Sequence, residues 1–401
     1  MIRRWSWRPG EAGPTLAAAL LLALFTVSCA THAPQPGTPP VAPPTAAPAA
    51  PATPATPPAP TASAVVFPGA TWERADRPES VGFSSVKLEA VRERLATMAT
   101  TGLVAVSQGR VFFEYGNITE VSYIASVRKS VLAMLFGNYV ESGKVRLDKT
   151  LAEMGITDHG GLTPQEQEAT IADLLSAKSG VYHPASNAGD NLADAPPRGS
   201  QKHGTYFLYS NWDFNALGTI FERETGRGIY DALETDLARP IGLEDFQRAL
   251  HRKSGDLERS IHPAYHMHFS TRDMARIGYL MLHEGNWNGR QVVPRAWARR
   301  IVTPVTRNTE MNPASLRNGT FGYGYLWWIV DGPTATGPFE GAYTGMGAGG
   351  QFISVLPKLD LVVAHKKKVP PSDRSVGGGE YFRLLGMIAD AYSGLTARSG
   401  E

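Results

Sequence analysis

Cysteine is nearly absent from this chain of 401 residues, which contains only Cys29. One thiol cannot form an intramolecular disulfide, so we expect the hydrophobic core alone to hold the fold together. An excess of charge of one sign is also absent, because 39 lysines and arginines stand against 37 aspartates and glutamates. The resulting net charge of +2 provides no long-range field that would gather nucleic acid. We therefore expect no nucleic-acid partner.

Several signatures of other enzyme classes are missing from the sequence. It contains no GxSxG nucleophile elbow, which argues against a Ser-His-Asp hydrolase. The glycines at 377–379 are not followed by the GK[ST] of a phosphate loop, so nucleotide binding has no support. His262, His266 and His268 form an HxxxHxH cluster, but no nearby carboxylate or cysteine supports a zinc site. The sequence predicts neither a metal nor a cofactor.

The N-terminal residues follow the order of a secretory signal. Three arginines within the first eight residues precede an apolar run at 16–27, which is too short for a stable membrane anchor. Ser28 and Cys29 then resemble the end of a bacterial lipoprotein signal, in which the cysteine is lipidated. Thr26 stands where such signals usually carry leucine, so ordinary cleavage nearby is the alternative. We expect an exported, periplasmic protein that touches the membrane only through Cys29.

The remainder of the chain divides into a tether and one folded domain. Residues 30–66 are mostly proline, alanine and threonine, a composition that cannot bury enough surface to fold and favours an extended spacer. Residues 67–396 show no second break in composition. We therefore predict a signal at 1–29, a disordered tether at 30–66 and a single domain at 67–396.

Strand-like apolar runs occur near both ends of this domain, and helical periodicities fill the region between them. The early strands, at 103–106 and 111–113, form a predicted hairpin with its turn at Gln108-Gly109. The basic run 366–368 is expected at the exposed end of the last strand. The later strands are predicted at 323–330, 351–356 and 361–364, and the helices at 85–98, 126–139, 171–176, 212–224, 230–237, 271–282 and 382–392. This order predicts an α/β (α+β) fold, with an antiparallel sheet completed by both chain halves and a helical insert at roughly 140–290.

A serine and a lysine open one of the predicted helices. Ser126 stands at its start, and Lys129 follows three residues later on the same face, in an SxxK arrangement. The positive end of the helix dipole and the ammonium both favour a developing alkoxide, so the hydroxyl can be activated without histidine. The alternative is a serine cap followed by a solvated lysine, which is common in helices.

Two later segments have the residue types that such a serine would need. Tyr209 and Asn211 stand directly before another predicted helix, where a phenol beside an ammonium becomes a credible base. The alternative there is a polar loop that caps the helix. Tyr343-Thr344-Gly345 then leads into glycines before the strand at 351–356, and such a backbone can point an N–H group into a site. An ordinary glycine-rich turn is the alternative.

The order SxxK, then YxN, then a glycine-rich turn resembles the serine beta-lactamase and penicillin-binding-protein superfamily, over roughly 67–395. The segments 126–130, 179–184, 209–218 and 349–351 are similar to its class C-like branch, which contains esterases and 6-aminohexanoate-dimer hydrolase. The resemblance implies a beta-lactamase/transpeptidase-like fold. It also implies two-step acyl transfer, in which Ser126 attacks an ester or amide carbonyl while Lys129 and Tyr209 move its proton.

The resemblance further implies how a substrate is held. The oxyanion would bind the amide of Ser126 and one from the glycine-rich turn, either Ala348 or Met346, of which Ala348 is preferred. Asn211 would orient Lys129 and donate to a substrate carbonyl. Two tyrosines complete the predicted contacts, Tyr182 closing over the substrate and Tyr343 occupying the position where true beta-lactamases carry Lys or His.

Because that cation is missing, we expect small esters or linear amides as substrates. Beta-lactams and D-amino-acid peptides are the alternatives within the same chemistry. A covalent penicillin-binding sensor without turnover is the alternative of another class, and a tethered structural protein with an inactive site is a third.

Overall fold

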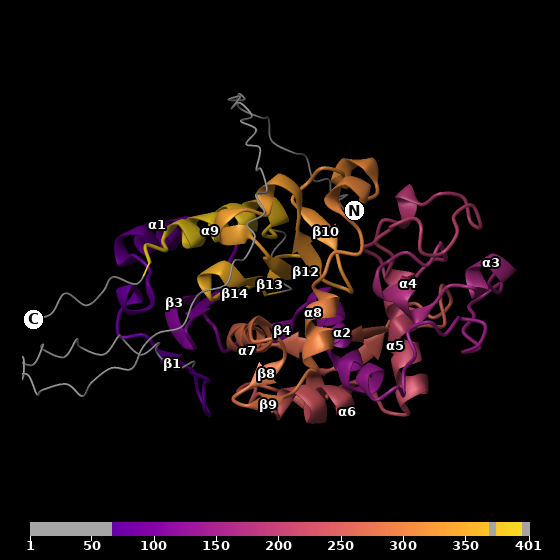
Figure 1. The fold of residues 1–401 in the computed structure, drawn as a ribbon, viewed down its shortest axis with the longest axis horizontal. Helices are drawn as coiled ribbons and strands as arrows, with labels where there is room; N and C mark the ends of the chain where they lie inside the picture. The colour runs from indigo at the N-terminus through magenta and orange to yellow at the C-terminus, as the bar shows by residue number, and fades with distance from the viewer. Residues whose placement is uncertain (1–65, 369–373, 395–401) are drawn as a thin grey trace, which may run out of the picture. The chain divides into compact units, whose positions relative to one another are not determined.

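The computed structural model describes residues 66–368 and 374–394. The predicted signal, Cys29 and all but the last residue of the predicted tether lie outside these ranges, and their roles stay predictions. The described chain is organised around one eight-stranded sheet (Figure 1), and every neighbouring pair of strands is antiparallel except the first. In spatial order the strands are β1 (Glu73–Arg74), β3 (Arg110–Gly116), β2 (Gly102–Ser107), β14 (Leu361–Lys366), β13 (Gln351–Leu356), β12 (Tyr343–Gly347), β11 (Trp328–Val330) and β10 (Phe321–Tyr323).

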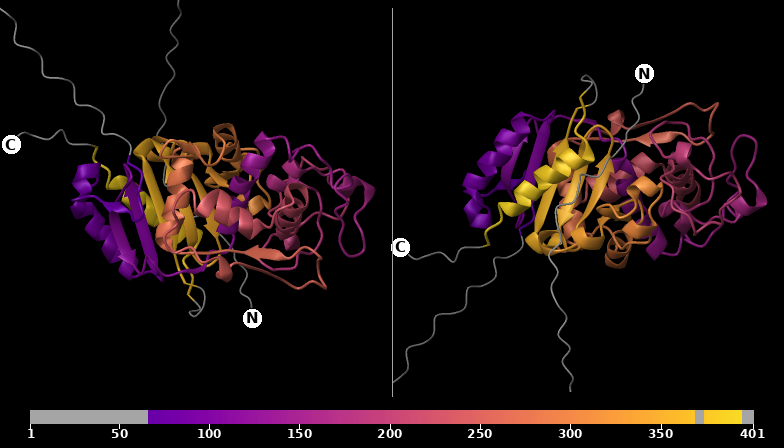
Figure 2. Two further views of the ribbon diagram at one scale, coloured as in Figure 1. Left: turned by 90° about the horizontal axis from the view of Figure 1, so that it is seen from below. Right: turned by 90° about the horizontal axis from the view of Figure 1, so that it is seen from above.

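The two chain halves meet where β2 pairs with β14, in a register that joins Val104 to Ala364. Figure 2 shows this junction as indigo strands beside yellow and orange ones. The predicted hairpin is confirmed, because Gln108 and Gly109 both take positive φ, 51° and 74°, as a tight turn between twisted strands requires. The expectation that both halves complete one sheet is therefore confirmed.

Alternating side chains place a separate hydrophobic core on each face of the sheet. On β13, Ile353 and Val355 belong to one core, while Phe352 and Leu356 belong to the other. Two helices, α1 (Ser85–Ala96) and α9 (Gly378–Asp390), cover the second face, as Figure 1 shows. The first face is covered by α7 (Thr271–Leu282), α2 (Val127–Glu141) and α8 (Arg295–Ile301).

The remaining helices form the inserted part beside the end of the sheet that holds β10 (Figure 2). They are α3 (Pro164–Gln167), α4 (Ile171–Leu175), α5 (Asn211–Thr225) and α6 (Ile229–Ala232). Three two-stranded ribbons lie outside the main sheet, formed by β4 (Ser122–Tyr123) with β7 (His268–Phe269), β5 (Arg252–Ser254) with β6 (Ala264–His266), and β8 (Asn286–Trp287) with β9 (Arg290–Gln291). Within the described ranges, no helix has both the length and the apolar character needed to cross a bilayer.

Two expectations about single segments are wrong. The strand predicted at 323–330 is split into β10 and β11, because Leu326 adopts a φ of 59° and the chain turns back on itself. The basic run is not exposed at its start, since Lys366 and Lys367 are 2% and 4% exposed. Lys366 Nζ reaches the carbonyls of Ser122 and Phe269, so it ties the end of β14 to the β4–β7 ribbon. These carbonyl oxygens, from a ribbon distant in the sequence, explain why the Lys366 amine is buried. Sequence periodicity gives no sign of such long-range partners.

Candidate active site

The residues that precede Ser126 hold it in place at the start of α2. The preceding ribbon pairs Tyr123 with His268, and Ile124 N–H donates to Met267 O at 3.1 Å. Ala125 then takes a φ of 48°, a left-handed conformation that is uncommon for a residue with a side chain. Ser126 is half-buried, and its hydroxyl makes no capping hydrogen bond to the described backbone. Its oxygen is therefore available to other partners.

Lys129 connects three of the predicted residues in one cluster. It is 1% exposed, and its Nζ lies 3.1 Å from Ser126 Oγ, 2.7 Å from Tyr209 OH and 2.7 Å from Asn211 Oδ1. The same nitrogen sits 4.2 and 4.3 Å from the ring centroids of Tyr209 and Phe214. The solvated lysine that sequence alone allowed is excluded by this burial.

Burial sets the protonation of the cluster. It holds the pKa of Lys129 well below its ordinary value, and the positive charge of Arg128 lowers it further, while Asp190 acts in the opposite direction. Burial also raises the pKa of Tyr209 to about 12, against smaller lowering effects of Ser126 and Arg128. Both shifts run against a lysine ammonium paired with a tyrosine phenolate, since a water-poor site favours the neutral form of each group.

A neutral amine has the geometry of a base for Ser126. It keeps two N–H donors and gains a lone pair, in contrast to the three donors of an ammonium. Donation to Tyr209 and Asn211, the two closer partners, directs the lone pair toward Ser126 Oγ. The arrangement can therefore withdraw the hydroxyl proton as the oxygen attacks, with the Tyr209 phenol as a proton donor next to it.

Asn211 is held from both sides. Its Nδ2 donates to Ala188 O at 3.0 Å, and its backbone N–H donates to Asp190 Oδ2 at 3.1 Å. These contacts fix which end of the amide faces Lys129, so that Oδ1 accepts from the lysine. Neither Ala188 nor Asp190 was identified in the sequence, because their loop has no motif and reaches Asn211 only through the fold.

The glycine-rich end of β12 lies directly against the serine. A Cβ placed on Gly347 would come within 3.1 Å of Ser126 N and 2.5 Å of Ile124 O. Only glycine permits this approach, which brings the β12–β13 turn to the serine amide. Ala348 follows immediately, while Met346 packs against the core on the opposite face of the sheet. The choice of Ala348 as the second amide donor stays a prediction.

Gly347→Ala is expected to lower kcat/KM for an ester substrate by about 10- to 100-fold, because the new methyl group must push β12 away from Ser126. Steady-state kinetics on folded protein would measure the loss. Gly386→Ala is the matched control, since a Cβ at that helical position meets no described atom within 4 Å. Equal rates for the two variants would contradict a close approach of β12.

The two other predicted tyrosines are buried. Tyr343 is 5% exposed, and its ring packs edge-on against Trp327 at 5.4 Å, so burial raises its pKa. Tyr182 is 8% exposed, and among the described residues its hydroxyl has no hydrogen-bond partner. The Tyr182 hydroxyl oxygen is itself buried. The structure groups Ser126, Lys129, Tyr209 and Asn211, and their contacts do not extend to these two tyrosines.

The histidines that suggested zinc have other contacts. His262 Nε2 lies 2.9 Å from Thr157 O, and its Nδ1 lies 2.9 Å from Thr219 Oγ1. His266 and His268 pack their rings against Tyr123, at 5.0 and 5.7 Å. In the part of the chain that the structure describes, no group of three or more His, Cys, Asp or Glu side chains is placed to hold a metal ion.

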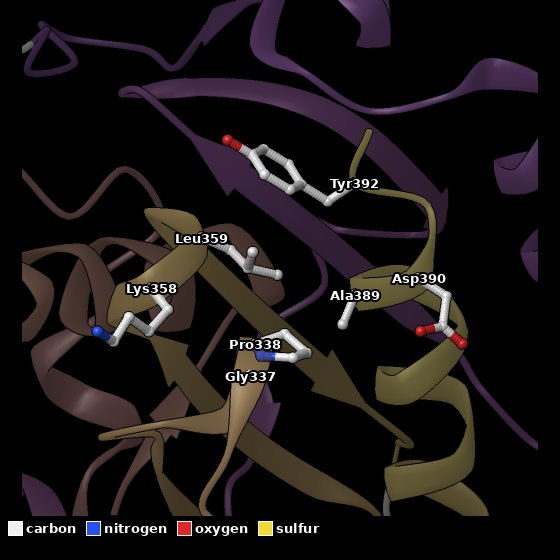
Figure 3. Close-up of a pocket in the computed structure, with 7 residues that line it drawn as sticks. All are labelled: Gly337, Pro338, Lys358, Leu359, Ala389, Asp390 and Tyr392. Carbon is white, nitrogen blue, oxygen red and sulfur yellow. The ribbon is translucent and has the colours of Figure 1, made fainter. Parts of the chain in front are cut away.

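The pocket drawn in Figure 3 lies away from this cluster, where α9 ends beside two short helical turns at Gly337–Phe339 and Pro357–Leu359. It is lined by Gly337, Pro338, Lys358, Leu359, Ala389, Asp390 and Tyr392. None of these residues contacts Ser126 or Lys129, so the pocket plays no part in the chemistry considered for that pair.

Comparison with known proteins identifies the family. The Beta-lactamase family model matches residues 91–377, which include the whole cluster around Lys129. The chain belongs to the beta-lactamase family. The 6-aminohexanoate-dimer hydrolase of Paenarthrobacter ureafaciens is 23% identical over 323 residues, 72% of this chain and 78% of the relative.

Two solved structures share the fold of this beta-lactamase family member. A penicillin-binding-protein homologue from Caulobacter crescentus has a TM-score of 0.56 at 17% identity, covering 80% of this chain and 99% of the other. A family VIII carboxylesterase has a TM-score of 0.54 at 13% identity, covering 77% and 99%. The predicted beta-lactamase/transpeptidase-like fold and the predicted superfamily are thus confirmed, and the family and its named relatives indicate a hydrolase.

Proposed function

We propose that this protein is a serine hydrolase that cleaves esters or linear amides through an acyl-enzyme on Ser126. One observation carries the proposal: Lys129 Nζ is buried and lies within hydrogen-bond distance of Ser126 Oγ, Tyr209 OH and Asn211 Oδ1 at the same time. Ser126 Oγ bonds to the carbonyl carbon as Lys129 accepts its proton. Tyr209 then protonates the leaving alcohol or amine as its bond to carbon breaks, and recovers a proton from Lys129.

The second step returns the enzyme to its starting state. Water attacks the acyl carbonyl while the Lys129 and Tyr209 pair accepts its proton, and Ser126 Oγ leaves with a proton from the same pair. The oxyanion of both steps would be held by the amides of Ser126 and Ala348, because Gly347 brings the two backbones together. No metal or cofactor is required by this sequence of events.

Aromatic side chains beside the cluster favour an apolar group on the substrate. Trp328 is half-buried and stacks on Tyr209, with ring centroids 5.6 Å apart and an interplanar angle of 30°. Tyr323 packs edge-on against Trp328 at 5.1 Å. Since the position that would recognise a substrate carboxylate is the buried Tyr343, the site fits neutral esters and linear amides better than beta-lactams.

A substrate panel tests the proposal. We expect turnover of short p-nitrophenyl esters and of linear amides, and slower hydrolysis of a chromogenic cephalosporin. D-amino-acid peptides belong in the same panel. Preferential hydrolysis of the cephalosporin or of those peptides would contradict the substrate class. A persistent adduct in intact-mass spectra without product release would instead identify a covalent sensor.

The pH dependence of kcat/KM is expected to follow Lys129. Burial lowers the pKa of this amine well below its ordinary value, so activity should reach its plateau at a lower pH than with an ordinary lysine and fall as the pH drops through that lowered value. An ordinary lysine would give a rising limb near pH 10.4. Initial rates across a pH series, on protein shown to stay folded, make the comparison. A rate that keeps rising into that alkaline range would contradict a neutral amine base.

A further inference from the structure

Arg128, the residue before the central lysine, is a buried cation with few partners. Its side chain is 1% exposed, and its guanidinium carbon lies 4.9 Å from the centre of the Tyr265 ring. Its one hydrogen bond to the described chain runs from Nη2 to Asn215 Oδ1 at 3.2 Å. Nε is buried with no partner among the described residues, and no described carboxylate forms an ion pair with Arg128. Burial of an arginine with so little compensation is costly, and the fold alone does not explain it.

The contact with Asn215 repeats the contact of the catalytic lysine. Asn211 and Asn215 lie one turn apart on α5, and their Oδ1 atoms accept from Lys129 and Arg128, which are adjacent on α2. The two amides also donate to the same loop, at 186–188. Asn211 Nδ2 reaches a backbone carbonyl there, and Asn215 Nδ2 reaches the Asn187 Oδ1 at 2.8 Å and the Ser186 Oγ at 3.3 Å.

We propose that Arg128 and Asn215 are a positioning pair, which docks residues 186–188 against α5 and thereby fixes the amide of Asn211 and the nitrogen of Lys129. The assignment rests on the proposed hydrolase function. Neither residue touches the reacting atoms. Asn215 is 0% exposed and bridges a side chain of α2 to the loop, so its amide determines where the loop lies relative to Asn211.

The charge of Arg128 has a second effect on the same centre. Its guanidinium carries a positive charge, and a like charge nearby disfavours a second one. Arg128 contributes to the lowered pKa of Lys129, after burial itself. The group that opposes it is Asp190, which also accepts the Asn211 backbone N–H. Tyr230, Tyr265 and His266, from the elements packed against Arg128, are held neutral at neutral pH by burial and add no charge.

Three variants separate docking from charge. Asn215→Leu removes the docking contacts and keeps the charge of Arg128. We expect kcat/KM for a p-nitrophenyl ester to fall by about 10- to 100-fold. The acidic limb of the pH profile of kcat/KM should stay at its wild-type pH. Arg128→Met removes both the hydrogen bond to Asn215 and the positive charge, so the acidic limb of the same profile should move to a pH about one unit higher. Arg128→Lys keeps a charge that can reach Asn215 and should restore the limb. Arg146→Met, at a guanidinium whose side chain is 63% exposed, is the matched control.

Thermal midpoints distinguish positioning from loss of structure. Removal of a poorly compensated buried cation should leave the midpoint of Arg128→Met within a few degrees of wild type despite its lower activity. Activity that falls only in proportion to the folded fraction would overturn the proposal. The proposal would also be overturned if Arg128→Met and Asn215→Leu both showed the wild-type kcat/KM and the wild-type pH profile. An inactive wild type that also fails to label at Ser126 would instead reject the hydrolase function itself.

Discussion

Ser126→Ala is expected to abolish ester hydrolysis, with kcat falling on the order of 10⁴-fold or more, because the oxygen that forms the proposed acyl bond is removed. The variant should remain folded. Ser126 is half-buried and makes no capping hydrogen bond to the described chain, so the free energy of unfolding should change by less than about 1 kcal/mol. Release of p-nitrophenol from a short-chain ester measures the rate, and circular dichroism during heating measures the fold.

Ser142→Ala is the matched control at the opposite end of α2. That serine follows the last helical residue and donates to Tyr139 O at 3.2 Å, with no contact to the cluster around Lys129. It should keep full activity. Wild-type turnover in Ser126→Ala would reject the nucleophile and with it the whole proposed mechanism.

Tyr209→Phe is expected to lower kcat by about 10²- to 10⁴-fold, the usual contribution of a positioned proton donor or acceptor. Only the hydroxyl is removed, so the ring can keep its stacking on Trp328 and its contact with Phe214. Lys129 loses one of its two closer hydrogen-bond partners. Its amine is then less well oriented, and its lone pair points less consistently toward Ser126. The loss should appear mainly in kcat, with a smaller change in KM.

Tyr139→Phe controls for the removal of a phenol. The Tyr139 hydroxyl donates to Asp236 Oδ2 at 2.9 Å and accepts from Arg227 at 2.6 Å, so its loss should affect stability and leave the rate alone. A rate and pH profile of Tyr209→Phe that match the wild type would remove Tyr209 from the mechanism.

Local periodicity predicted much of the fold. The helix predicted at 271–282 matches α7, and the strand predicted at 351–356 matches β13, because an amphipathic or continuously apolar run reports burial directly. The turn at Leu326 was missed, since its positive φ depends on a hydrogen bond from Leu326 N–H to Leu175 O. That partner lies far away in the sequence and leaves no local pattern.

Only the residues of the candidate site that belong to recognisable motifs could be predicted from the sequence. Spacing placed Lys129 near Ser126, and resemblance brought Tyr209 and Asn211 to them. The protonation state was not predictable, because it depends on how much water the fold excludes from Lys129. Arg128 and Asn215 were missed for a related reason. A charged residue on a predicted helix suggests a solvated surface, and only tertiary packing shows that this one is buried.

Labelling with a fluorophosphonate followed by peptide mapping tests the central claim most directly. The reagent traps an activated serine without needing the natural substrate, so its result does not depend on the substrate class. We predict one phosphonyl group per chain on the peptide that contains Ser126, with strongly reduced labelling in Lys129→Met because the hydroxyl then lacks its base. A protein that hydrolyses esters yet carries the label on another residue, or carries none, would contradict the account.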